Sequence, residues 1–115
     1  MKATIQSVKL VRIDEVWKKH KPQGLGFSDN DAIVLTLKTE KGKKISQTFY
    51  CRIKGDGTLG HSITKASEKR QQNLRNFIKN YISEEKRYNI RKNHQKWKGK
   101  KVDVIKVEDG YILKI

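Results

Sequence analysis

Aromatic rings alternate with cations in three segments of this chain, and the first lies in 44–54. A ring offers a planar surface on which a nucleobase can stack, and a nearby lysine or arginine offers a counter-charge for its phosphate. Tyr50 lies among cations on the polar side of an expected strand. With one residue of the preceding strand, the candidates on this face are Lys38, Lys44, Tyr50, Arg52 and Lys54. Alternatively, Tyr50 packs over the stems of neighbouring lysines.

The second segment, 14–31, contains the only proline and several glycines, which break both helix and sheet. We expect a long loop, and loops of this length are often functional. Its rings are again interleaved with charge, and its candidate residues are Trp17, Lys18, Lys19, Lys21 and Phe27. The alternative for Trp17 is that it plugs one end of the fold.

The third segment is the basic stretch 83–99, with candidates Tyr88, Arg91, Lys92, Lys96 and Trp97. As a helix or an extended arm, it could cross a phosphate backbone without reading bases. The alternative for Trp97 is a core position against Ile90.

Groups that could perform catalysis are scattered. The three histidines lie in different segments, and none has a second ligand three or four residues away, so a zinc site is not expected. Cys51 is the single cysteine and lies on the apolar side of its strand, where it reads as a core residue. Asp29 with Asp31 is the one pair of carboxylates that suggests the magnesium site of a nuclease, although their neighbours favour a turn. We assign no catalytic residue, metal or cofactor.

The chain has 27 Lys plus Arg against 12 Asp plus Glu, a formal net charge of +15 over 115 residues. The excess is uneven, because 65–101 holds 13 basic and 3 acidic side chains. Such a surface attracts polyanions, and nucleic acid is the expected partner. The alternative is a protein kept soluble by surface lysines.

Length and composition suit one domain, 1–115. We find no uninterrupted apolar stretch of about 18 residues and no secretory signal, so we expect no membrane partner. The expected location is cytoplasmic, and nucleoid-associated if the partner is DNA.

Apolar periodicity predicts the elements. A long strand with a bend or bulge is expected over 2–13, because its two-residue spacing changes phase. Alternation continues over 32–39 and 43–54, separated by a turn at 40–42. The final stretch, 100–115, has an Asp-Gly pair at its centre and is typical of a hairpin.

One helix is expected between these groups of strands. Its apolar stripe is Leu74, Phe77, Ile78, Tyr81 and Ile82, and its possible caps are Ser62, Thr64 and Ser67. The basic stretch 83–99 either extends this helix or starts a second one at Ser83.

This order of elements resembles the OB-fold, a mostly β (α+β), five-stranded Greek-key barrel with a helix between strands three and four. The run from Trp97 to Val104 is similar to the entry to the fourth strand in small archaeal and phage OB-fold proteins that bind single-stranded DNA. The resemblance implies an oligonucleotide site on strands two and three. The basic insertion is longer than the simplest members need, which leaves an SH3-like barrel or another small α+β sheet as alternatives.

The resulting hypothesis is a non-catalytic protein that binds single-stranded rather than duplex nucleic acid, DNA or RNA, with little sequence specificity. A protein partner in a replication or ribonucleoprotein complex is possible. The alternatives are a structural RNA-binding component of a ribonucleoprotein and a small metal-dependent nuclease.

Overall fold

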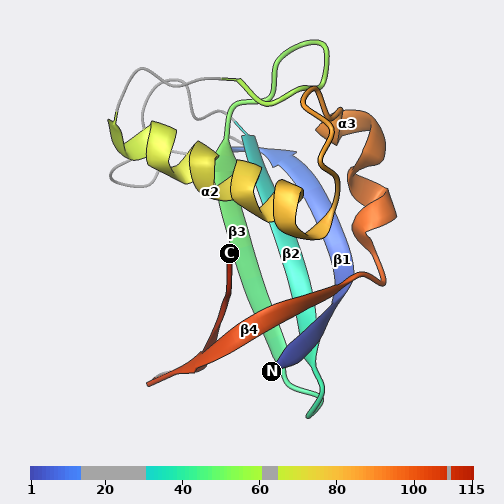
Figure 1. Cartoon of the computed structure of the whole chain (residues 1–115), viewed down its shortest axis with the longest axis vertical. Coiled ribbons are helices and arrows are strands. Elements are labelled where there is room, and N and C mark those ends of the chain that lie inside the picture. Colours follow the sequence, from blue (N-terminus) through green and yellow to red (C-terminus); the bar gives the residue numbers. More distant parts are fainter. Residues whose placement is uncertain (14–30, 61–64, 109) are drawn as a thin grey trace.

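The computed structural model describes residues 1–13, 31–60, 65–108 and 110–115. Its five antiparallel strands follow the order β3-β2-β1-β4-β5 (Figure 1). They are β1 (Lys2–Arg12), β2 (Asp31–Thr39), β3 (Lys44–Cys51), β4 (Lys101–Val107) and β5 (Gly110–Leu113). The edge strands β3 and β5 approach one another, but the described residues form no hydrogen-bonded ladder between them. The result is a nearly closed barrel, which confirms the expected OB-like architecture.

The predicted irregularity in the first strand is a β-bulge. Ile5 lies opposite Leu37, whereas Ser7 lies opposite Thr36, so Gln6 is the extra residue. Without it, the two-residue period could not keep both Ile5 and Val8 inside the barrel, where they are 1% and 2% exposed.

The expected main helix is α2 (Lys65–Tyr81), which lies across the barrel (Figure 1). Leu74, Phe77 and Ile78 of its apolar stripe are buried. Ser67 lies inside the helix and accepts a hydrogen bond from Arg70, so it is not the N-terminal cap. The other two cap candidates, at 62 and 64, lie outside the described residues.

The basic stretch 83–99 does not extend α2, which ends at Tyr81. It contains a short helix, α3 (Ile90–Asn93), followed directly by a 3₁₀ turn, η1 (His94–Trp97). The start is not Ser83, because Asn89 caps α3: its Oδ1 accepts a hydrogen bond from the backbone N–H of Lys92 at 2.9 Å.

The core lies between α2 and the inner face of the sheet. Phe77 is at its centre, with ring centroids 5.2 Å from Phe49 of β3 and 5.6 Å from Trp97. Cys51 is fully buried beside them, as its place on the apolar side predicted. No helix within the described ranges has the length and apolar character that crossing a membrane requires.

Candidate nucleic-acid interface

The outward face of β1, β2 and β3 is rich in hydroxyls and lysines. These side chains alternate with buried ones, and the outward positions within the three strands carry no carboxylate. We call this surface the strand face. Its polar members are Lys2, Thr4, Ser7, Lys9, Thr36, Lys38, Lys44, Ser46, Thr48 and Tyr50.

Three lysines of neighbouring strands line up at one end of this face. Lys38 is directly opposite Lys44, and Thr4 is the register partner of both Lys38 and Lys101. The order across β3, β2, β1 and β4 is therefore Lys44, Lys38, Thr4 and Lys101, at a strand spacing of about 4.8 Å. All three lysines are exposed. We call them the lysine row.

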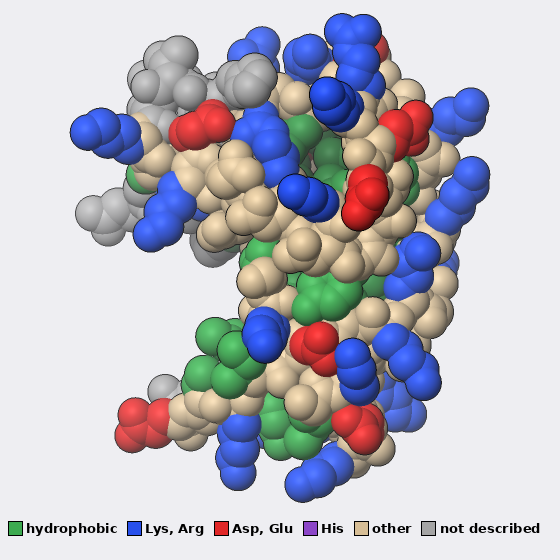
Figure 2. Space-filling view, in the orientation of Figure 1, with side chains coloured by type: hydrophobic (Ala, Val, Ile, Leu, Met, Phe, Trp, Pro, Cys, Tyr) green, Lys and Arg blue, Asp and Glu red, His purple; other side chains and the backbone are tan. Residues whose placement is uncertain are grey.

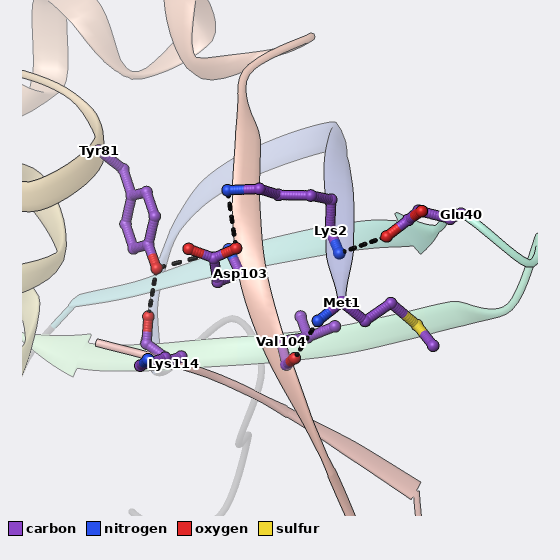
Figure 3. Close-up of polar contacts among 7 residues, drawn as sticks. All are labelled: Met1, Lys2, Glu40, Tyr81, Asp103, Val104 and Lys114. Atoms are coloured by element: carbon purple, nitrogen blue, oxygen red, sulfur yellow. Dashed lines mark hydrogen bonds and ion pairs between the residues drawn. The ribbon is translucent and has the colours of Figure 1, made fainter.

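A carboxylate beside the lysine row already has a partner (Figure 3). The Lys2 ammonium lies 2.8 Å from Asp103 of β4, and its hydrogen bond lowers the pKa of that carboxyl below its ordinary value. Glu40, which follows β2, accepts a hydrogen bond from the backbone N–H of Lys2 at 2.7 Å. Asp103 is therefore paired with an ammonium, whereas Glu40 keeps its negative charge beside the row, where the hollow that it lines also carries Lys2, Lys38 and Lys101.

The other predicted residues of β3 lie at the opposite end of that strand. Tyr50 is half-buried, whereas Arg52 and Lys54 are exposed. The expected strand over 43–54 is shorter than predicted, because β3 and its ladder with β2 end at Cys51. Residues 52–54 pair with 58–60 instead: Ile53 is bridged to Leu59, and the N–H of Gly60 donates to the carbonyl of Arg52. Arg52 and Lys54 thus belong to this short pairing beyond the end of β3 and not to the strand face.

Lys54 instead lines a groove that includes Tyr88, so the structure brings together two residues predicted from different segments. The groove has a volume of about 630 Å³ and lies between α2, the turn region 54–59 and the segment 83–90. We call it the α2 groove. It is lined by Lys54, Thr58, Leu59, Arg75, Ile78, Lys79, Ser83, Glu84, Glu85, Lys86, Arg87, Tyr88 and Ile90.

The stretch 86–101 contains eight cations and no acid, and we call it the basic segment: Lys86, Arg87, Arg91, Lys92, Lys96, Lys98, Lys100 and Lys101. Backbone contacts hold it against the barrel. The N–H of Ile90 donates to the carbonyl of Gly57 at 2.8 Å, and the N–H of Gly99 donates to that of Ile5 at 2.8 Å. The predicted residues Arg91, Lys92 and Lys96 are all exposed on it.

Trp97 is a core residue, as the alternative interpretation had it. Its side chain is 0% exposed, and its indole N–H donates to the hydroxyl of Tyr88 at 2.9 Å. The two rings are stacked, with centroids 6.5 Å apart and an angle of 26°. A base cannot reach Trp97 in this arrangement, so we correct its assignment from binding to packing. Tyr88 remains half-buried at the groove.

Five predicted residues lie outside the described part of the chain: Trp17, Lys18, Lys19, Lys21 and Phe27.

Sequence reasoning also missed several cations that the fold brings to these surfaces. Lys101 joins the lysine row only through the pairing of β1 with β4, and Lys79 reaches the α2 groove through the packing of α2. A signal existed for Lys86 and Arg87, because they begin the longest stretch of unopposed positive charge.

The described residues contain no group of three or more His, Cys, Asp or Glu side chains placed to hold a metal ion. Comparisons with protein-family models, curated proteins and solved structures found no match to this chain. Its function has to be inferred from the geometry and the charge of its surface.

Proposed function

We propose that this protein binds single-stranded nucleic acid through the strand face, with little base specificity. The observation that carries the proposal is the lysine row, in which Lys38 and Lys44 face each other on adjacent strands. Like charges in this position destabilise a sheet. A phosphate backbone lying over the row would turn that repulsion into attraction to a shared anion.

The rest of the strand face has the groups that such a backbone needs. Serine and threonine hydroxyls donate hydrogen bonds to phosphate oxygens, and the strand face carries five of them: Thr4, Ser7, Thr36, Ser46 and Thr48. The absence of carboxylates from the outward positions of these three strands reduces the repulsion that would oppose an anion, and the nearest acids are Glu40 and Asp103 at the end that carries the lysine row.

Tyr50 favours a single strand over a duplex. It lies at the far end of the strand face from the lysine row and is half-buried. An unpaired base can stack on such a ring, whereas a base in a duplex is already stacked. Stacking and phosphate contacts both tolerate sequence variation, so the proposed binding is general.

The test is Lys44→Glu, which places opposite charges across from each other on β2 and β3. We expect the free energy of unfolding to rise by about 0.2–1 kcal/mol, because a repulsive cross-strand pair becomes attractive. The affinity for oligo-dT of about 12 nucleotides, a length within the site sizes of OB domains, should fall at least roughly tenfold. Urea unfolding and fluorescence anisotropy measure the two effects.

The matched control is Lys69→Glu, which makes the same charge change at an exposed position of α2. It should weaken binding much less than Lys44→Glu, because Lys69 lies on a different surface. Equal affinities for the two variants would show that the strand face is not the site. Stronger binding to a duplex or to an RNA hairpin than to oligo-dT would contradict the preference for an unstructured single strand.

A further inference from the structure

We infer that the α2 groove is a second nucleic-acid subsite, which takes one unpaired base inside it and the flanking phosphates on its cationic rim. The inference rests on the proposed function and extends it to a surface on the helix side of the barrel. No residue of the strand face as defined above lines this groove.

The floor of the groove is apolar. Ile78 of α2, Ile90 of α3 and Leu59 line it, and Leu59 is the more accessible of the three, since Ile78 and Ile90 are only 7% and 1% exposed. A volume of about 630 Å³ is within the range of roughly 300–1,000 Å³ typical of small-molecule pockets, so a nucleobase fits. An apolar floor suits a nucleobase, because the flat faces of a base are also poorly hydrated.

Tyr88 supplies a ring that is already fixed in place. Its hydroxyl accepts the 2.9 Å hydrogen bond from the indole N–H of Trp97, and the stacked Trp97 ring is itself buried. A base that stacks on Tyr88 therefore does not have to immobilise it first, and this preorganisation favours binding.

The rim of the groove is mainly cationic. Lys54, Lys79, Lys86 and Arg87 line it, together with Arg75, which is already bonded to Glu68 at 2.9 Å and to the carbonyl of Gly60 at 2.8 Å. Glu84 and Glu85 also line it. Figure 2 shows lysine and arginine side chains, with some acidic ones, around green apolar surface in the upper part of the molecule.

This charge pattern suits a nucleotide better than a simple anion or an apolar ligand. The excess of cations attracts phosphate, and a carboxylate can accept a hydrogen bond from the exocyclic amino group of a base, as acidic side chains do with cytosine. Adenine and cytosine carry such a group, so the subsite should prefer them to thymine.

The position of the groove supports a continuous path for one strand. Lys54 follows the end of β3, and Lys86 and Arg87 begin the basic segment, so the groove joins the two cationic surfaces. A strand that leaves the strand face past Tyr50 and Arg52 reaches the groove next. Tracking of a backbone along cations, with bases stacking at intervals, is the usual mode of single-strand binding.

The direct test is a titration with AMP, followed by NMR of the methyl groups. We expect the signals of Leu59, Ile78 and Ile90 to shift and saturate, while those of Val34 on the outer side of β2 stay in place. Ser83→Trp, which fills the groove without changing charge, should abolish the shifts. The inference is overturned if AMP leaves the groove signals unmoved in the wild-type protein.

The second test uses the double variant Lys86→Gln/Arg87→Gln and its matched control Lys65→Gln/Lys69→Gln, which removes two exposed cations from the first turns of α2. For oligo-dA of about 12 nucleotides, the groove variant should lose affinity at least fivefold, and its salt slope should fall by about 1.4, at 0.7 per lost phosphate contact. The control should keep the wild-type slope. Equal slopes in the two variants would overturn the inference.

The two proposals fail separately. If Lys44→Glu weakens binding but the groove variant does not, the strand face is the site and the groove takes no part. If only the groove variant weakens binding, the proposed role of the strand face is wrong and the α2 groove is the main site.

Discussion

At the residue scale, Tyr88 connects the core to the proposed site. Its ring lies at the α2 groove, while its hydroxyl satisfies the indole N–H of Trp97 at 2.9 Å. Since Trp97 is fully buried, that N–H has no route to solvent. The hydroxyl therefore has a structural role, one face of the ring is stacked on Trp97, and the proposed base contacts the part of the ring that lines the groove.

Tyr88→Phe separates these two roles. Removing the hydroxyl leaves a buried donor unsatisfied, and we expect the free energy of unfolding to fall by about 1–3 kcal/mol. The ring stays, so affinity for a single strand should be close to wild type. Urea unfolding gives the first quantity and anisotropy the second.

Tyr50→Phe is the matched change at the other half-buried tyrosine of the proposed interface. We expect it to change the free energy of unfolding by less than about 0.5 kcal/mol, as for most surface substitutions. Should Tyr88→Phe be equally harmless, the hydrogen bond to Trp97 would not contribute to the stability of the fold.

At the element scale, the turn over 54–58 fixes the start of the basic segment. Gly57 has φ of +88°, and a Cβ built on it would collide with the side chain of Asn89, the cap of α3. Asn89 also donates to the carbonyl of Asp56 at 3.0 Å. The turn and the helix cap are packed so closely that only glycine fits between them.

Gly57→Ala should therefore lower the free energy of unfolding by about 1–3 kcal/mol, combining the penalty for positive φ with the loss of the cap. Gly55→Ala in the same turn is the control, because nothing lies within 4 Å of its Cβ and its φ is not positive. We expect it to stay within about 0.5 kcal/mol of wild type. Thermal and urea unfolding of the two variants measure both free energies. Equal stabilities of Gly57→Ala and Gly55→Ala would contradict the packing described.

The elements differ in how far local sequence determines them. The strands and the stripe of α2 follow from alternation and helical periodicity, and both were predicted. The strand over 43–54 was predicted too long, because the alternation continues past Cys51, where the ladder with β2 ends, into residues that pair with 58–60 instead. The local sequence determines how far the alternation of apolar and polar residues runs. The residue at which a strand ends depends instead on where its pairing with the neighbouring strand stops.

The candidate site was predictable only in part, for the same reason. The charge and the rings of each segment are visible in the sequence, and they identified Lys38, Lys44, Lys54 and Tyr88. The juxtaposition of Lys44 and Lys38 with Lys101 depends on the pairing of four strands, and that of Lys54 with Tyr88 depends on how the segment 83–90 packs. Trp97 was ambiguous because burial depends on the whole core.

At the scale of the whole molecule, the net charge of +15 acts on folding and on binding with opposite signs. Cations that crowd one small domain repel one another, so their mutual repulsion destabilises the free protein. The same cations attract a polyanion, whose phosphates replace the missing counter-charge. A bound single strand should therefore stabilise the fold beyond what its contacts with individual residues contribute.

Potassium chloride separates the two effects. Added salt screens the repulsion, so the melting temperature of the free protein should rise with salt concentration. The complex should behave in the opposite way, because salt competes with the protein for phosphates: the increase in melting temperature caused by oligo-dA should shrink, with log K falling by about 0.7 per phosphate contact for each decade of salt. Thermal unfolding followed by circular dichroism, with and without the oligonucleotide, measures both. Lys44→Glu should weaken both trends, since it removes repulsion from the lysine row and a phosphate contact at once. A stabilisation by oligo-dA that does not depend on salt would mean that the cations do not contact the strand.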